Sequence, residues 1–159
     1  MPAPPLAPPE GWVPVQPFPE LAAARSFVSG DPAGERMRVA YFRTDASESL
    51  YARAWFGPGA EGPPGQAHGG AIAAVLDEAM GAVTWMHGHK AVAGRIGVTF
   101  NQFVPLGTDT TVEAWVDQVD GRKVATRARM TDPRGQLLAE SDGVFVVMPP
   151  ERLAEFART

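Results

Sequence analysis

The chain has 159 residues, of which 45% are hydrophobic, enough for one domain with its own core. Its formal net charge of -4 argues against a nucleic-acid-binding protein, which would carry a basic surface. Because the chain has no cysteine, disulfides, zinc–thiolate sites and a cysteine nucleophile are excluded. The sequence shows neither a signal-peptide pattern nor an apolar run long enough to cross a bilayer, so we expect a cytoplasmic protein with no membrane partner.

Eight prolines in the first twenty residues predict an extended N-terminal arm, because proline interrupts helices and sheet ladders. We expect Trp12 and Phe18 to fix this arm to the surface of the domain, with a disordered leader as the alternative. A short helix is expected over residues 21–29. These segments form an N-terminal region of residues 1–36.

A long helix is predicted over residues 68–86, HGGAIAAVLDEAMGAVTWM, after two strands over 37–44 and 49–57 and a loop over 57–65. The apolar residues at helical spacing are Ile72, Val75, Leu76, Ala79, Met80 and Val83. The opposite face carries small residues instead of the Lys, Glu and Arg typical of an exposed helix face. We therefore expect another subunit or a ligand to pack against that face.

The start of this helix and one of its acids have the properties that acyl transfer needs. Gly69 and Gly70 leave backbone N–H groups at the positive end of the helix dipole, and the Gly70 N–H is our candidate oxyanion donor. Asp77, nine residues after His68, is the candidate carboxylate. The alternatives are that the glycines only allow close packing and that Asp77 is a solvated or salt-bridged acid. Glu78 lies about 100° around the helix, and we expect it to have a surface or ion-pair role.

The rest of the chain has the alternation of antiparallel strands, over residues 96–101, 112–117, 124–130 and 137–148. Turns are expected at 105–107 and 132–135, and Asp120-Gly121 predicts a hairpin. Residues 151–159 are expected to form a short helical cap. Two strands, one long helix and a four-strand meander define an α+β fold.

Three segments resemble the hotdog-fold acyl-CoA thioesterases of the phenylacetate-pathway type: HGGAIAAVLDEAMG, a strand ending in VPLG, and a hairpin with GRK. The resemblance implies a hotdog domain over residues 37–150, with a long central helix wrapped by a curved antiparallel sheet. It also implies homodimers, often paired into tetramers, with active sites at the subunit contact. The implied reaction is hydrolysis of an acyl-CoA thioester without a metal or organic cofactor.

The resemblance also implies roles for individual residues. Asp77 matches the catalytic nucleophile or general base, which faces the HGG loop of the neighbouring subunit. We expect His68 to bond the thioester region or the loop backbone and so to orient the substrate; the alternative is a structural histidine at the helix entry. Further positions match contacts to the substrate: Thr99 and Asn101 along the pantetheine route, Arg122 and Lys123 at the nucleotide end of coenzyme A, and Thr126 and Arg127 on the following strand, Arg127 toward a phosphate. Surface solubility is the alternative for the basic hairpin residues.

The chain departs from the family pattern at two positions. Ala93 stands where related enzymes often have Ser or Thr, and Gly62 stands where some have Asn, so a backbone group or Gln66 would have to replace these polar groups. The acyl pocket is expected to draw on large apolar residues, namely Met80, Trp85, Met86, Phe100 and Phe103.

Two other functions and one other site remain open from the sequence. A non-catalytic protein that binds acyl-CoA or an acyl carrier is supported by the missing hydroxyl at Ala93. An enoyl-CoA hydratase of the same fold would need an Asp–His pair, whereas the histidine here precedes two glycines. His87 and His89 have the spacing of metal ligands but no third ligand, and are expected at the helix C-terminus, where the dipole favours them.

Overall fold

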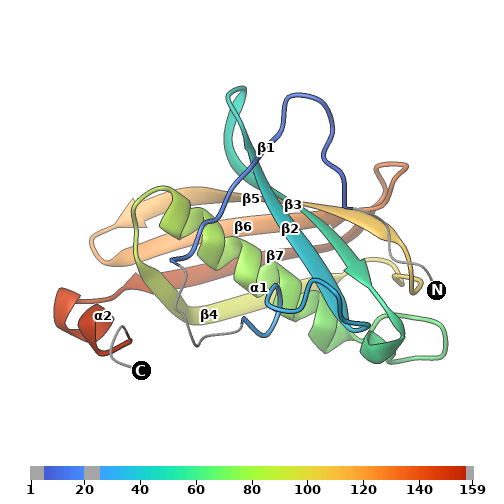
Figure 1. The fold of residues 1–159 in the computed structure, drawn as a ribbon. Coiled ribbons are helices and arrows are strands. Elements are labelled where there is room, and N and C mark those ends of the chain that lie inside the picture. The colour runs from blue at the N-terminus through green and yellow to red at the C-terminus, as the bar shows by residue number, and fades with distance from the viewer. Residues whose placement is uncertain (1–5, 20–25, 157–159) are drawn as a thin grey trace.

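The long helix, α1 (Gly69–Met86), lies across one face of a curved antiparallel sheet (Figure 1). The computed structural model describes residues 6–19 and 26–156, and within them the sheet has seven strands in the order β1-β2-β3-β5-β6-β7-β4. The strands are β1 (Val13–Pro14), β2 (Met37–Thr44), β3 (Ser47–Phe56), β4 (Ala91–Phe100), β5 (Asp109–Asp120), β6 (Lys123–Thr131) and β7 (Leu137–Val147). A 3-10 turn (Pro58–Ala60) precedes α1, and α2 (Pro150–Phe156) follows β7. This arrangement confirms the α+β hotdog fold.

The predicted apolar stripe of α1 faces the sheet. Val75, Leu76 and Met80 are fully buried there, against alternate residues of the strands such as Ala114 on β5 and Ala128 on β6. Side chains on successive strand residues point to opposite faces, so the other residues of each strand form the outer face of the sheet. The helix therefore buries one side against the core and leaves its small-residue side available for other contacts.

The expected four-strand meander is wrong for β4. Strands β5, β6 and β7 follow one another as antiparallel neighbours, but β4 pairs with β7 at the sheet edge, and β5 pairs with β3. The chain after Phe100 crosses below the start of α1, where the Ala67 N–H donates to the Val104 carbonyl at 2.8 Å and the Gly107 N–H to the Phe56 carbonyl at 2.9 Å. Alternation of apolar and polar residues identifies strands but not which strands pair with one another. The crossing of the chain after Phe100 determines the order of the strands in the sheet.

As an edge strand, β4 is largely exposed. Three of its apolar side chains, Val92, Ile96 and Phe100, are exposed in the single chain. A long edge strand with unpaired backbone groups and apolar side chains is a surface that favours pairing with another strand.

Both aromatic anchors of the N-terminal arm make the expected contacts. The Trp12 ring lies 4.5 Å from the Tyr51 ring on the outer face of the sheet, next to the pairing of β1 with β2. The Phe18 ring lies 5.9 Å from the Trp85 ring, on the helix side. The arm thus passes around the sheet edge to reach α1. Of the helix expected over 21–29, residues 21–25 lie outside the described residues, and 27–29 form a turn.

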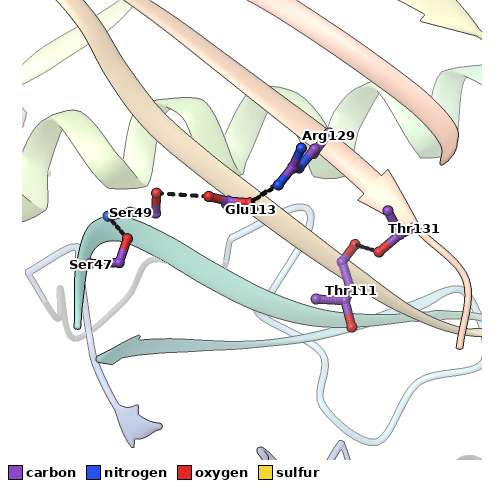
Figure 2. Close-up of polar contacts among 6 residues, drawn as sticks. All are labelled: Ser47, Ser49, Thr111, Glu113, Arg129 and Thr131. Atoms are coloured by element: carbon purple, nitrogen blue, oxygen red, sulfur yellow. Dashed lines mark hydrogen bonds and ion pairs between the residues drawn. The ribbon is translucent and has the colours of Figure 1, made fainter. Parts of the chain in front are cut away.

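Polar side chains connect three strands on the outer face of the sheet (Figure 2). The Ser49 hydroxyl donates to the Glu113 carboxylate at 3.1 Å, and Arg129 donates to the same carboxylate at 2.7 and 3.1 Å. The Thr131 hydroxyl donates to the Thr111 carbonyl at 3.5 Å. These cross-strand contacts join β3, β5 and β6 on the face that α1 does not cover.

The β5–β6 hairpin and the C-terminal helix agree with two further expectations. The β5–β6 hairpin turns at Gly121 and Arg122, with Gly121 at φ 58°, a left-handed conformation that glycine adopts without strain. Helix α2 occupies the position of the predicted C-terminal cap, of which residues 157–159 lie outside the described residues. Among the described residues, the helices are too short or too polar to span a membrane.

Candidate functional site

Asp77 lies beside a cavity of about 680 Å³ on the small-residue side of α1. The walls come from five parts of the chain: the arm at Phe18, the segment at Val28, helix α1 at Gly81 and Trp85, the start of β4 at Ala93, and the end of the sheet with α2. Asp77 is half-buried, and the described residues offer its carboxylate neither a hydrogen bond nor an ion pair. A half-buried carboxylate without a partner, beside a largely apolar cavity, is a candidate functional group.

The surroundings of Asp77 favour its protonated form. Burial raises the pKa of Asp77 above the usual value for aspartate, and the charge of the adjacent Glu78 raises it further. A carboxylate with a raised pKa is a better proton acceptor than an ordinary aspartate. These two effects make Asp77 suitable as a general base.

Glu78 is engaged in hydrogen bonds to other elements. Its carboxylate accepts a hydrogen bond of 2.8 Å from the Tyr41 hydroxyl of β2 and another from the Ser26 hydroxyl. Burial raises the pKa of Tyr41 well above its usual value, and the nearby Glu78 charge raises it further, so the phenol remains a donor. Glu78 therefore links the helix to β2 and to the segment after the arm, in place of the ion pair or plain surface position that we expected.

The start of α1 is capped by His68. Its Nδ1 accepts a hydrogen bond of 2.8 Å from the Gly70 N–H, so the ring proton of a neutral His68 is on Nε2. The Gly70 N–H, our first candidate for the oxyanion donor, is therefore already bonded. The Gly69 N–H, at the first position of the helix, has no acceptor among the described residues. The free donor at the positive end of the helix dipole is thus Gly69.

Asp77 and the helix start do not meet within one chain. The eight residues from Gly69 to Asp77 correspond to about 12 Å along the helix axis, because each residue advances about 1.5 Å. A thioester carbonyl in contact with the Gly69 N–H is therefore out of reach of the Asp77 carboxylate of the same chain. The two groups can act together only if they come from two chains.

The predicted substrate contacts also lie far apart within one chain. Thr99 is exposed near the end of β4, on the outer face opposite Glu140, and Asn101 is exposed just after the strand. Arg122 and Lys123 are exposed at the other end of the sheet, where the Arg122 Nε donates to the Val147 carbonyl at 3.2 Å. The length of β4 separates the two groups, roughly 20 Å or more at about 3.3 Å per residue.

The next two predicted contacts occupy positions that do not face the Asp77 cavity. Thr126 is buried on the helix side of β6, and its hydroxyl donates to the Gly143 carbonyl at 3.4 Å. Arg127 lies on the outer face, where its Nε is 3.4 Å from an Asp117 carboxylate oxygen. Both side chains already have partners within the chain.

The two departures from the family pattern have different structural settings. Ala93 lines the same cavity as Asp77, so a hydroxyl at this position would face the cavity beside the Asp77 carboxylate. A Cβ at Gly62 would lie 2.8 Å from the His68 Cα, so this loop has no room for a side chain without backbone movement. Gln66 does not replace the missing polar groups, because its Oε1 is buried without a partner among the described residues and Gln66 does not line the cavity.

The apolar residues expected around an acyl group lie mostly elsewhere. Trp85 lines the cavity, but Met80 and Met86 pack in the core, and Phe100 and Phe103 are exposed near the helix start. Sequence reasoning missed the other walls, Phe18 and Phe145, because they come from segments far from α1 in the chain. The small residues on this helix face were the signal that something else packs there.

The two histidines after α1 lie at its C-terminal end, as expected, where the His89 N–H donates to the Thr84 carbonyl at 2.8 Å. His87 caps the helix C-terminus, and its Nε2 lies 2.7 Å from the Glu48 carbonyl oxygen. In residues 6–19 and 26–156, no three His, Cys, Asp or Glu side chains are placed to share a metal ion.

Comparison with known proteins agrees with the fold. Residues 64–139 match the Thioesterase superfamily model. The chain is 28% identical over 134 residues to the acyl-coenzyme A thioesterase THEM4 of Bos taurus. The aligned region covers 83% of this chain and 55% of the relative. The chain thus spans about half the length of the curated relatives it matches.

Solved structures show the same architecture. A thioesterase superfamily protein with 26% identity superposes with a TM-score of 0.65, covering 69% of this chain and 53% of that one. The Escherichia coli PaaI protein from the phenylacetic acid degradation operon, at 15% identity, has the same fold with a TM-score of 0.65 over 70% of this chain and 80% of that one. With its central helix, its curved antiparallel sheet and its HGG helix start, the chain has the hotdog fold, and over residues 64–139 it is similar to the thioesterase superfamily.

Proposed function

We propose that the protein is an acyl-CoA thioesterase that hydrolyses an acyl-coenzyme A to the free acid and coenzyme A, without a cofactor. The observation that carries this proposal is the unpaired, half-buried Asp77 in an apolar cavity, at a position where the family places its catalytic acid. The similarity to relatives named acyl-coenzyme A thioesterases supports it. In this reaction Asp77 acts as general base on a water molecule or as nucleophile on the thioester carbon.

The active unit in this proposal is a homodimer. The separation of Gly69 from Asp77 along one helix requires a second chain, and the exposed edge of β4 is the surface by which two chains can pair. Antiparallel pairing of two β4 edges would place the end of one strand near the start of the other, and thus one helix start beside the partner's cavity. The Gly69 N–H of one protomer then polarises the thioester carbonyl near Asp77 of the other.

The same pairing would gather the predicted coenzyme A contacts. Arg122 and Lys123 lie at the β4-start end of each protomer, and Thr99 and Asn101 at the β4-end side, so a two-fold axis near the middle of β4 brings one pair from each chain together. The proposed dimer thus explains why these residues are far apart in one chain. Pairing of dimers into tetramers and a cytoplasmic location remain further parts of this proposal.

A second candidate is a non-catalytic protein that binds acyl-CoA or an acyl carrier. The observation that favours it is Ala93, which leaves the cavity near Asp77 without the hydroxyl that related enzymes often have. This candidate and the thioesterase share the binding site and differ only in thiol release.

Replacing Asp77 tests the reaction directly. Asp77→Asn keeps the shape of the side chain but removes the base, so we expect thiol release from acyl-CoA to fall by a factor of about 10²–10⁴. The matched control is Glu78→Gln, which should retain most of the activity because Glu78 bonds to Tyr41 and Ser26 rather than to substrate. If Glu78→Gln is the inactive variant and Asp77→Asn is active, the assignment is reversed. Tight acyl-CoA binding by the wild type without any thiol release would establish the binding protein instead.

The raised pKa of Asp77 predicts a pH dependence. Activity requires ionised Asp77, so kcat/KM should fall on the acid side at a pH above the usual aspartate range. Glu78→Gln removes the negative charge that opposes ionisation of Asp77, so its pKa should decrease and the acid limb should move to lower pH. Burial, the larger cause, remains in this variant, so the shift should be partial. An acid limb that does not move, measured with one acyl-CoA over the same pH range, would show that another group titrates.

Arg122→Ala tests the contact to the nucleotide end of coenzyme A. Loss of a phosphate contact should raise KM for acyl-CoA by about tenfold, equivalent to about 1.4 kcal/mol, and leave KM for a short N-acetylcysteamine thioester unchanged. Arg134→Ala, in the other exposed turn, is the control and should change neither value. Equal effects of Arg122→Ala on both substrates would argue against the phosphate contact.

A further inference from the structure

The cavity beside Asp77 continues toward the C-terminal end of α1 as an apolar channel. Gly81 and Trp85 line it on the helix, Phe18 lines it on the arm, and Phe145 lines it on β7. Its other apolar walls come from the start of β4 and from α2. The channel therefore begins at the proposed catalytic carboxylate and leads away from it between α1 and segments of the same chain.

Apart from Asp77 and Lys90, the polar side chains along this channel have partners among the described residues. The Trp85 indole N–H donates to the Ala91 carbonyl at 2.9 Å, and the Glu78 carboxylate accepts from Tyr41 and Ser26. Lys90, which also lines the cavity, lies beyond Trp85 in the chain, at the end far from the helix start. An occupant with hydrogen-bonding groups would lose its bonds to water and find few replacements, whereas a hydrocarbon chain needs none. The apolar lining of the channel therefore favours an apolar occupant.

The length of the channel sets the size of this occupant. Asp77 and Trp85 are eight residues apart, about 12 Å along the helix. An extended chain of tetrahedral atoms advances roughly 1.2 Å per bond, so about ten bonds fit between these positions. A volume of about 680 Å³ is within the range of small-molecule sites.

Gly81 lines the channel where two aromatic rings lie against the helix. A Cβ at this position would be 3.3 Å from the Phe145 Cε1 and 3.9 Å from the Phe18 Cζ. The absence of a side chain at Gly81 therefore lets both rings pack close to the helix backbone. A branched side chain at Gly81 would push these rings away from the helix and into the cavity.

We propose that this channel is the acyl-chain subsite, that it takes a linear, saturated acyl group of about eight to ten carbons, and that Gly81 and Phe18 determine the length it accepts. The inference rests on the proposed thioesterase function, because it places the thioester at Asp77. In this arrangement the N-terminal arm supplies one wall of the specificity pocket.

The first test compares wild type and Gly81→Val on acetyl-, butyryl-, octanoyl-, decanoyl- and palmitoyl-CoA. Wild type should have its highest kcat/KM on octanoyl- and decanoyl-CoA. Gly81→Val should lose at least about tenfold on these two substrates and keep its activity on acetyl-CoA, since a lost apolar contact of one to three kcal/mol changes kcat/KM by about 10–200-fold. Because valine at this buried position requires the Phe145 ring to move, the melting temperature of Gly81→Val is compared with that of the wild type, and Gly81→Ala, a smaller change, should give a weaker effect in the same direction.

Phe18→Ala should have the opposite effect to Gly81→Val, because it enlarges the channel. Removing this ring opens the wall that faces Gly81, so the preference should move toward palmitoyl-CoA. Equal losses on all chain lengths in Gly81→Val, with no change of preference in Phe18→Ala, would contradict the acyl subsite while leaving the thioesterase function intact. A change in oligomeric state of Gly81→Val without a change in chain preference would mean that a second subunit fills the channel.

The second test does not depend on hydrolysis. Decanoic acid brominated at its terminal carbon should quench the tryptophan fluorescence of the wild type, and Trp85→Phe should lose most of this quenching, because Trp85 is the tryptophan in the channel. Gly81→Val should prevent quenching. Quenching without any thiol release would support the subsite and reject the thioesterase; absence of quenching in the wild type would reject the subsite.

Discussion

The structure depends on one geometric constraint: the carboxylate and the backbone donor that thioester hydrolysis needs lie on one rigid helix, about 12 Å apart. A helix cannot bend to bring Gly69 and Asp77 together, so the proposed site needs two copies of it. The exposed edge of β4 and the unpaired state of Asp77 both fit this requirement. In the proposed dimer, the incomplete site of one chain is half of a site shared by two.

The two faces of this helix have different roles: one packs in the core, and the other lines the cavity. The apolar stripe around Val75 and Met80 is buried against the sheet, and this burial holds the helix in place. The small-residue side supports the cavity, where Gly81 allows Phe18 and Phe145 to approach the backbone. Glu78 connects the faces through its bond to Tyr41, so the element that carries Asp77 is fixed on both sides.

Much of the fold could be predicted from the sequence, because local patterns determine local structure. The helix over 68–86, the strand over 37–44 and the hairpin after Asp120 agree with the structure. The order of the strands could not be predicted, since it depends on the crossing after Phe100, which is held by backbone hydrogen bonds between distant segments.

The site was predictable only in part, for a similar reason. The helix-start motif and its resemblance to the family made His68 and Asp77 candidates, but the capping of Gly70 by His68 depends on a side-chain rotamer that no sequence pattern specifies. The walls of the cavity at Phe18 and Phe145 come together only in three dimensions. The predicted substrate contacts at Arg122 and Thr99 would meet only in the proposed dimer, which the sequence of one chain does not display.

The most direct test of the shared site is complementation between two inactive variants. Asp77→Asn removes the carboxylate, and Gly69→Pro removes only the Gly69 N–H, because proline is tolerated at the first helical position and His68 already has an extended backbone. We expect each homodimer to be inactive and the purified heterodimer to recover roughly half of the wild-type activity, since one of its two sites has both groups intact. A heterodimer as inactive as its parents would contradict the central claim that Asp77 and Gly69 of different chains form one site.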